Sequence, residues 1–207
     1  MAISAKTMNQ LKIILASASP TRKKLLEQLH IPFTVEASSY EEDITIDLPP
    51  KEIVKTFSQG KARDVAARHK NAIVIGADTI SLCDGEVMGK PVDEADATRM
   101  LKKLRGRAHT SLVGLTIINT TTGEEVSLVE TAEVHFRDIS DEEISAYIAT
   151  GEPFGKAGAY AIQEAGAAFI EKIIGEPYVP AGFPMSKMAQ MLYKMGTKPP
   201  IKVRLSP

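Results

Sequence analysis

Residues 12–29 read KIILASASPTRKKLLEQL, and this stretch decides the first unit of the fold. Apolar residues run continuously to Ala16 after the polar start at Lys12, which predicts a buried strand. Ser19 and Pro20 suit the N-cap and the first position of a helix. The helix would bury a stripe formed by Leu25, Leu26 and Leu29. The stretch therefore predicts a strand that turns through a hydroxyl-rich loop directly into a helix.

Periodicity and turn signals predict the remaining elements. In the first half these are a strand at 33–37, a long helix from about 50 to 69, a strand at 72–77 that ends in Asp78, an Asp84-Gly85 hairpin and a helix from Asp93 to Gly106. The second half has antiparallel strands within 109–137, a helix with a Ser140–Glu143 capping box, a Gly-rich segment at 151–166, a strand at 167–174 and a helix from Pro184. The expected fold class is therefore α/β, with a mixed β-sheet and flanking helices.

Composition indicates one globular domain. The chain has 207 residues, 43% apolar and 25% charged, which is enough for a buried core and ordinary for a soluble protein. No clear linker divides residues 1–207, so we expect a single domain with tails at 1–11 and 197–207. No apolar run approaches the roughly 20 residues of a membrane span, and the first ten residues do not resemble a signal peptide.

Charge and cysteine content limit the expected cellular compartment and the expected partners. The single cysteine, Cys83, excludes an internal disulfide framework and fits a reducing compartment, so we expect a cytoplasmic protein. Cys83 lies in an apolar run, which favours a packed thiol over a nucleophile. The net charge of −1 argues against nucleic acid as a partner, although a local basic cluster could still bind a small anion.

The loop from Ser17 to Lys24 is the first candidate site. Free backbone N–H groups and the helix dipole favour an anion at a helix N-terminus, and Ser17, Ser19 and Arg22 add directed donors. An ordinary Ser-Pro cap followed by solvated lysines explains the same residues equally well. The loop alone therefore leaves both interpretations open.

Two further candidates carry charge where an apolar residue is expected. Lys61 falls on the inward stripe of the long helix, so it must find a carboxylate or a ligand anion, extend to solvent, or lose its proton. Asp78 follows the strand AIVIGA, at the edge where open α/β sheets bind ligands, although it could equally be a structural aspartate. Glu41, Glu42 and Asp43 offer hard oxygen ligands that suit Mg²⁺ or Mn²⁺, or are simply solvated.

Two cation-bearing segments complete the candidates. Lys90 lies between Gly89 and Pro91, which restrict its backbone. The segment GEPFGKAGAYAIQ at 151–163 lacks the spacing and the metal-binding hydroxyl of a P-loop. It still offers the cation Lys156 and the amide of Gln163, which can donate and accept at once, as recognition of a base edge requires. The four histidines show no zinc spacing, and no GxSxG motif is present.

Taken together, these segments resemble the Maf family of nucleoside triphosphate pyrophosphatases. The matching motifs are LASASP at 15–20, Glu41-Glu42-Asp43, Lys61-Ala62, GADT at 76–79, DGEVMGKP at 84–91, GEPFGKAGAYAIQ at 151–163 and Gly182-Phe183-Pro184. Each motif alone is weak, but their order covers nearly the whole chain. The resemblance implies an elongated mixed-sheet fold in which two lobes flank a central cleft, as in Maf and ITPase proteins. It also implies a homodimer and hydrolysis of a nucleoside triphosphate to the monophosphate and pyrophosphate.

The resemblance also assigns roles. It implies Mg²⁺ or Mn²⁺ held by Asp78 and Glu42, with Asp78 orienting water and Arg22, Lys61 and Lys90 neutralising developing charge. The expected substrate contacts are Ser17, Ser19, Thr79, Lys156 and Gln163. GADT with AYAIQ is similar to the branch that favours dTTP and UTP, and a modified nucleotide remains an open alternative.

Three positions depart from the family pattern, and two other functions remain open. Thr21 stands where relatives commonly have Arg or Trp, Gly155 replaces a usual Asp, and Phe183 replaces a usual Leu. The main alternative is a non-catalytic nucleotide-binding regulator of cell division. A nucleic-acid-binding protein is disfavoured by the charge and by the lack of aromatic platforms.

Overall fold

One mixed sheet runs through the whole molecule, and the computed structural model describes residues 11–43 and 47–197 of it. The strands are β1 (Lys12–Leu15), β2 (Phe33–Val35), β3 (Ala72–Cys83), β4 (Glu86–Met88), β5 (Ala108–Asn119), β6 (Glu124–Phe136) and β7 (Ile170–Gly175). The helices are α1 (Pro20–Glu27), α2 (Pro50–Ala66), α3 (Glu94–Leu104), α4 (Asp141–Ala149) and α5 (Met185–Lys194), with short 3₁₀ helices η1 (Ala157–Ala159) and η2 (Ala165–Phe169). Except for Leu11 and Thr197, the predicted tails lie outside the described residues.

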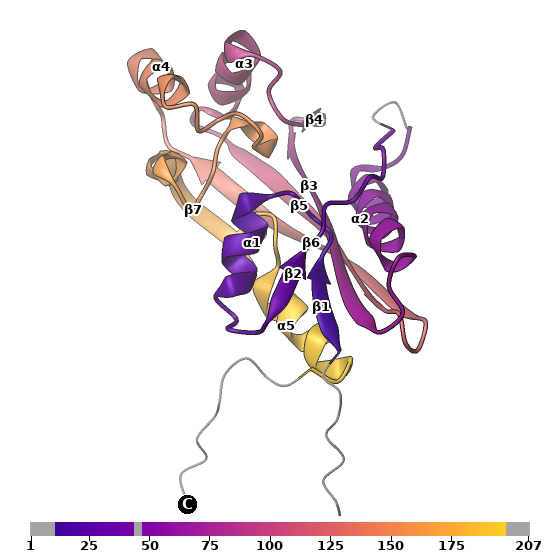
Figure 1. Ribbon diagram of the computed structural model, residues 1–207. Helices are drawn as coiled ribbons and strands as arrows, with labels where there is room; N and C mark the ends of the chain where they lie inside the picture. The colour runs from indigo at the N-terminus through magenta and orange to yellow at the C-terminus, as the bar shows by residue number, and fades with distance from the viewer. Residues whose placement is uncertain (1–10, 44–46, 198–207) are drawn as a thin grey trace, which may run out of the picture.

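The sheet is parallel at one end and antiparallel elsewhere. Its order is β2-β1-β3-β5-β6-β7, and β4 pairs with β3. β1 is parallel to both β2 and β3, whereas β3, β5 and β6 form long antiparallel ladders. The predicted α/β class with a mixed sheet is confirmed, and Figure 1 shows the long strands running the length of the molecule.

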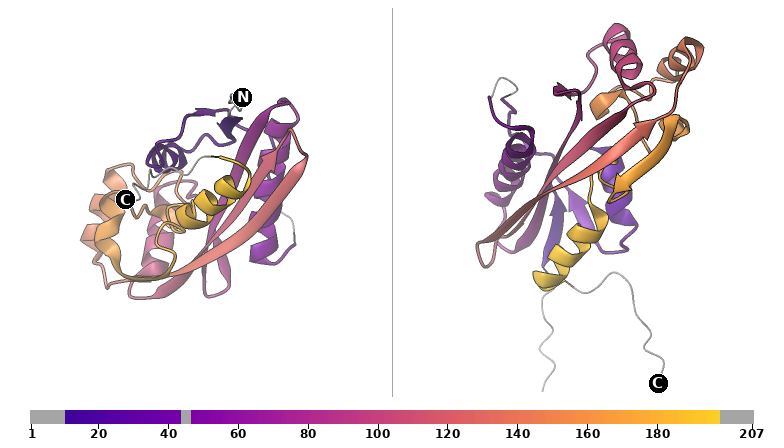
Figure 2. Two further views of the ribbon diagram at one scale, coloured as in Figure 1. Left: turned by 90° about the horizontal axis from the view of Figure 1, so that it is seen from below. Right: turned by 180° about the vertical axis from the view of Figure 1, so that it is seen from behind.

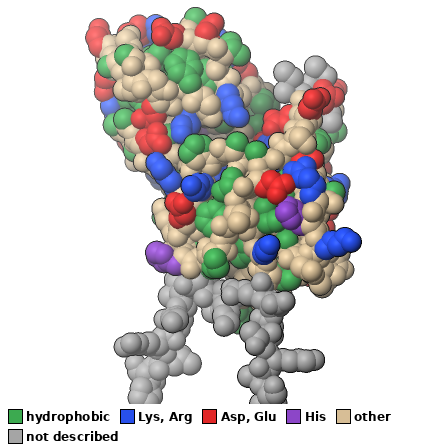
Figure 3. Space-filling view, viewed as in Figure 1, with side chains coloured by type: hydrophobic (Ala, Val, Ile, Leu, Met, Phe, Trp, Pro, Cys, Tyr) green, Lys and Arg blue, Asp and Glu red, His purple; other side chains and the backbone are tan. Residues whose placement is uncertain are grey.

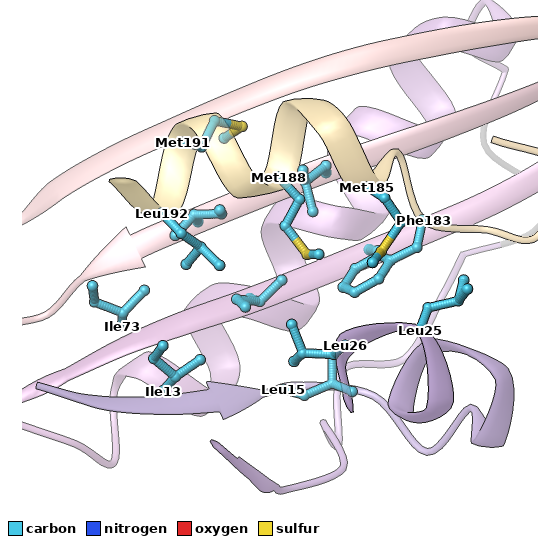
Figure 4. Packing of buried hydrophobic residues seen from close by; sticks show 14 of the residues in the cluster. Ile13, Leu15, Leu25, Leu26, Ile73, Phe183, Met185, Met188, Met191 and Leu192 are labelled. Carbon is cyan, nitrogen blue, oxygen red and sulfur yellow. The ribbon is translucent and has the colours of Figure 1, made fainter. Parts of the chain in front are cut away.

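Helices cover both faces of the parallel end, which explains why β1 and β3 are apolar without alternation. On one face, Ile13 and Leu15 belong to a core with α1 and α5. On the other face, Ile14 packs with Val65 of α2. Figure 4 shows Met185 and Met188 of α5 directed toward the strands, where their flexible side chains fill the core.

A second core forms a lobe at the other end of the sheet. Helices α3 and α4 bury Leu101, Leu104 and Ile144 against Val134 and Phe136 of β6. Along β6, Ala132, Val134 and Phe136 alternate inward, and all three are buried. Figures 1 and 2 show α3 and α4 at one end of the long strands, with α1 and α5 at the other. The two lobes are joined by β3, β5 and β6.

Two glycines let α2 lie directly on the sheet. A Cβ at Gly76 of β3 would lie 2.5 Å from the carbonyl oxygen of Ser58, and one at Gly114 of β5 would lie 2.0 Å from that of Val54. Both contacts are with helix backbone, which cannot move aside without moving the helix. The position of α2, and of every side chain on it, is therefore fixed closely relative to β3.

Most local signals are confirmed. Ser19 and Asp93 are N-caps, and the Ser140–Glu143 capping box is present. Asp84 and Gly85 have φ of 49° and 79°, the two positive values that a tight primed hairpin turn requires. Cys83 is buried, and burial raises the pKa of its thiol, so the prediction of a packed thiol agrees with the structure.

Four boundaries were predicted wrongly. β2 ends at Val35, because its partner β1 ends at Leu15, and α2 ends at Ala66 because its last N–H groups form tighter i→i+3 bonds. Asp78 lies inside β3 rather than at its end, since β5 and β6 support a longer strand than AIVIGA alone. The strand predicted at 167–174 begins only at Ile170, because residues 165–169 form η2, whose first N–H groups donate to the carboxylate of Glu152.

Candidate functional site

The site begins at a break in the pairing of β3. Its ladder with β1 covers Ala72–Ile75, and its ladder with β4 covers Ser81–Cys83. On that side, residues 76–80 pair with no strand, and the chain leaving β1 turns there into the Ser17–Ser19 loop. Asp78 therefore lies beside the carboxyl end of β1, although it is in the middle of its own strand.

Strand alternation sends consecutive side chains of β3 to different partners. Asp78 shares a face with Gly76 and points toward α2, where its Oδ1 accepts a 2.7 Å hydrogen bond from Lys61 Nζ. Thr79 points to the opposite face, where its hydroxyl oxygen accepts a 2.8 Å hydrogen bond from Arg22 Nη2. The two cations thus approach β3 from opposite sides.

Lys61 lies between two carboxylates. Its ammonium is 2.7 Å from Asp78 Oδ1 and 2.6 Å from Glu42 Oε1. The side chains of Lys61 and Asp78 are only 14% and 9% exposed, so this charge cluster is shielded from solvent more than a surface ion pair would be. Of the alternatives left open for the inward Lys61, the contact with carboxylates is the one found in the structure.

Arg22 is the centre of a second set of contacts. Its Nε donates to the carbonyl of Gly182 at 3.1 Å, and its Nη1 donates to Ser17 Oγ at 3.3 Å. Burial lowers the pKa of the guanidinium, while the negative charges of Asp78 and Glu42 act in the opposite direction. Arg22 stays a cation, held in a fixed orientation at the first turn of α1.

The other wall of the site is the segment from Gly151 to Gly166. Glu152 holds it together by accepting hydrogen bonds from Tyr147 Oη and from the N–H groups of Ala165 and Gly166. From this segment, Gln163 Nε2 donates to Thr21 Oγ1 at 3.0 Å, and Lys156 Nζ lies 3.4 Å from the same oxygen. The segment is therefore linked to the first turn of α1.

These walls enclose one cavity of about 1130 Å³. All ten residues predicted for the site line it, namely Ser17, Ser19, Arg22, Glu42, Lys61, Asp78, Thr79, Lys90, Lys156 and Gln163. Lys90 is exposed beside Gly89, whose carbonyl accepts the N–H of Gly158 at 3.0 Å. Lys23 and Lys24 are exposed to solvent. Figure 3 shows basic and acidic side chains gathered along the boundary between the two lobes.

The donor set suits a divalent ion that is shared with a phosphate. Within the described residues, no group of three or more His, Cys, Asp or Glu side chains could hold a metal alone. Asp78 and Glu42 nevertheless converge on one point, the ammonium of Lys61. Mg²⁺ is commonly bound by one or two carboxylates together with substrate phosphates and water. The two carboxylates fit that mode of binding.

Known proteins match this chain over most of its length. The Maf-like protein family model matches residues 12–195. The chain belongs to this family. A protein of Methanosarcina barkeri named dTTP/UTP pyrophosphatase is 46% identical over 186 residues, which cover 89% of this chain and 94% of that protein. One of Dictyoglomus turgidum with the same name is 45% identical, covering 89% of this chain and 96% of the relative.

A more distant likeness comes from solved structures. The Staphylococcus aureus Ham1 protein gives a TM-score of 0.38 at 15% identity, covering 61% of this chain and 72% of that one. Within the described residues, no helix combines the length and the apolar character needed to cross a membrane.

Three contributors to this Maf-like site were not identified as such from the sequence. Glu152 was not singled out, although it lies between two glycines in GEPFG, and such a loop needs side-chain hydrogen bonds to fix its conformation. Gly182 was noted only as part of a motif, and its role comes from a backbone carbonyl that sequence does not display. Thr21 was noted as a departure and was assigned no partner, yet it is 7% exposed and contacts both Lys156 and Gln163.

Proposed function

We propose that this protein hydrolyses dTTP and UTP to the nucleoside monophosphate and pyrophosphate. The observation that carries the proposal is the single cavity into which all ten predicted site residues project. The cavity combines clustered cations and carboxylates with an amide that can contact a base. Relatives more than 40% identical over most of the chain carry the name dTTP/UTP pyrophosphatase.

The two walls of the cavity would bind different parts of the substrate. The cations Arg22, Lys61 and Lys90 would bind the triphosphate, because all three line the same cavity. Ser17 and Ser19 lie at the loop into α1 and would position the phosphate oxygens with their hydroxyls. Lys156 and Gln163 on the opposite wall would contact the nucleoside.

In this proposal Asp78 would orient the attacking water, since its carboxylate lines the cavity. As the water oxygen bonds to the α-phosphorus, Asp78 accepts a proton from it, and the bond to the bridging oxygen breaks. Pyrophosphate then leaves with the electron pair. Arg22 and Lys61 stabilise its growing negative charge, and fixed cations act strongly in a partly desolvated site.

We propose Mg²⁺ or Mn²⁺ as the cofactor, held by Asp78 and Glu42. The ion would supply Lewis-acid polarisation of the phosphate oxygens. Lys61 would then exchange part of its contact with the carboxylates for a contact with phosphate. Removal of divalent ions with a chelator should abolish turnover, and Mg²⁺ or Mn²⁺ should restore it. The cytoplasmic location, the homodimer and the absence of a nucleic-acid partner stay predictions.

Asp78→Asn tests the catalytic assignment. Pyrophosphate release from dTTP with Mg²⁺ should fall by about 10²-fold or more, as for other losses of catalytic electrostatics. Asp138→Asn, at an exposed aspartate outside the cavity, is the matched control and should keep wild-type turnover. Near wild-type turnover of Asp78→Asn would contradict the assignment.

The same assay separates the enzyme from a non-catalytic nucleotide-binding regulator. A regulator would bind dTTP through the same cavity and release no pyrophosphate, with or without metal. A panel of normal and modified nucleotides in this assay would show whether a modified base is the better substrate.

A further inference from the structure

Glu42 is the one member of the charge cluster that lies on neither a helix nor a strand. Lys61 is on α2 and Asp78 is on β3, whereas Glu42 follows β2 in a segment without regular structure, residues 36–43. Its Oε1 nevertheless lies 2.6 Å from Lys61 Nζ. Since no helix or strand holds this segment, the position of the Glu42 carboxylate depends on the contacts that the segment makes with the rest of the molecule.

Asp64 of α2 binds the middle of this segment. Its Oδ2 accepts hydrogen bonds from Ser38 Oγ and from the backbone N–H of Ser39, both at 2.8 Å, and its Oδ1 accepts a third from Ser39 Oγ at 3.0 Å. The two serines are 26 and 25 residues away in the sequence. Ser38 Oγ in turn accepts the N–H of Tyr40 at 3.0 Å. One carboxylate therefore fixes three consecutive residues of the segment.

An aspartate on a helix is often only the partner of a cation one turn away. Arg68 does lie one turn further along α2, with its Nη1 3.2 Å from Asp64 Oδ1. That contact does not account for the three hydrogen bonds that come from outside the helix. The backbone N–H of Ser39 and the hydroxyl of Ser38 lower the pKa of Asp64, so the carboxylate is charged, and charged acceptors form stronger hydrogen bonds than neutral ones. Asp64 therefore acts on the segment as well as on its own helix.

Asp64 and Lys61 lie one turn apart on α2. The segment also passes close to this helix at Tyr40, since a Cβ added at Gly60 would collide with the Tyr40 ring. Two residues beyond Tyr40, the chain reaches Glu42 and its contact with Lys61. The same helix thus carries the ammonium and the residue that holds the segment bearing its partner. Asp64 is not among the described residues that line the cavity, so it would act on the reaction through Glu42.

We propose that Asp64 is a positioning residue, which holds residues 36–43 against α2 so that Glu42 meets Lys61 in the cavity. This inference rests on the proposed function, in which Glu42 belongs to the reacting site. A segment released from α2 would sample many positions, so its carboxylate would spend less time beside Lys61. Reacting groups that are poorly placed lower the rate of the chemical step. The loss should therefore appear in kcat, and it should be smaller than the loss on removing Lys61 itself.

Hydrogen exchange measures whether Asp64 holds the segment. Asp64→Ala removes the acceptor of all three hydrogen bonds, whereas Asp64→Asn keeps a carbonyl oxygen for the two at Oδ2. Amide exchange in peptides that cover residues 36–43 should be about tenfold faster in Asp64→Ala and close to wild type in Asp64→Asn. Glu125→Ala is the matched control and should leave this exchange unchanged. Glu125 of β6 accepts two hydrogen bonds from Arg63, the neighbour of Asp64 on α2.

Pyrophosphate release from dTTP shows whether the position of the segment matters for the reaction. We expect kcat to fall about tenfold in Asp64→Ala, while KM changes much less. In Asp64→Asn and Glu125→Ala, kcat should stay near the wild-type value. In a Glu42→Gln background, Asp64→Ala should lower kcat no further, because the carboxylate that it positions is gone.

Four results would overturn the inference. The first is unchanged exchange of residues 36–43 in Asp64→Ala, and the second is faster exchange with a wild-type kcat. The third is an equal loss of kcat in Glu125→Ala, which would indicate a general effect on α2. The fourth is a full further loss in the Glu42→Gln background. Failure of the proposed function is seen separately, as absence of pyrophosphate release from dTTP by the wild type, and the exchange measurement does not depend on it.

Discussion

On one side of the cavity, Asp78 and Lys61 project from β3 and α2, whose backbones are in direct contact at Gly76. On the other side, Lys156 and Gln163 lie on a segment without long helices or strands. There, hydrogen bonds of side chains such as Glu152 and Thr21 fix the conformation, as backbone pairing does at β3. In this molecule Asp78 and Lys61 of the charge cluster are therefore positioned by a strand and a helix, whereas the base-contacting groups are positioned by a few polar side-chain contacts. Changes to the first wall should therefore alter kcat, and changes to the second should alter KM.

The largest effect should come from Lys61→Met. It removes the ammonium between Asp78 and Glu42 and leaves two carboxylates facing the incoming triphosphate. We expect kcat for dTTP to fall by about 10²- to 10³-fold, measured by pyrophosphate release. Lys23→Met, at an exposed lysine of α1, is the control and should leave kcat unchanged. A Lys61→Met effect confined to KM would break the distinction between the two walls.

Gly76→Ala tests whether the contact between α2 and β3 holds the first wall. The added Cβ would lie 2.5 Å from the Ser58 carbonyl oxygen, so α2 must shift outward and carry Lys61 away from Asp78. We expect the free energy of unfolding to fall by about 1–3 kcal/mol, the usual cost of overpacking, in urea denaturation. Gly89→Ala is the control for stability, because a Cβ there meets nothing within 4 Å. Equal stability of the two variants would show that the close approach is dispensable.

The difference between the two walls also explains which site residues could be predicted from the sequence. Asp78 and Lys61 stand out in it because each is a charge in an apolar pattern, and regular elements have a period against which such exceptions are visible. Their pairing was not predicted, since it depends on how α2 lies on β3. Thr21 and Glu152 do not stand out in this way, because a polar residue breaks no apolar pattern at the start of a helix or in a loop, and their contacts join residues far apart in sequence. The strand expected at 167–174 is present from Ile170 as β7, and only its start was wrong: the Glu152 carboxylate, 13 residues before Ala165, accepts hydrogen bonds from the N–H groups that begin η2.

A pH effect on stability should appear in the second lobe, where β5 contacts the Gly-rich segment. His109 of β5 contacts Tyr160 of the segment through Nε2, 2.9 Å from the hydroxyl oxygen, and burial lowers its pKa to about 4. The unfolded chain takes up this proton near pH 6.5, so the folded state loses stability as the pH falls from about 6.5 to 4. At pH 5 the loss from this group is about 2 kcal/mol. Urea denaturation should show a shallower decline in His109→Asn, and identical slopes would exclude His109 as the cause.

The smallest effect, and the sharpest test of the second wall, should come from Glu152→Ala. It removes the acceptor of three hydrogen bonds, from Tyr147 Oη and from the N–H groups of Ala165 and Gly166, so the segment that carries Gln163 loses its internal tie. Because Glu152 is outside the charge cluster, we expect KM for dTTP to rise about tenfold, equivalent to about 1.4 kcal/mol, while kcat changes much less. Glu171→Ala, at an exposed glutamate of β7, is the matched control and should change neither constant. If kcat fell as far in Glu152→Ala as in Lys61→Met, the segment would be holding the reacting phosphates as well, and the division between the two walls would be wrong.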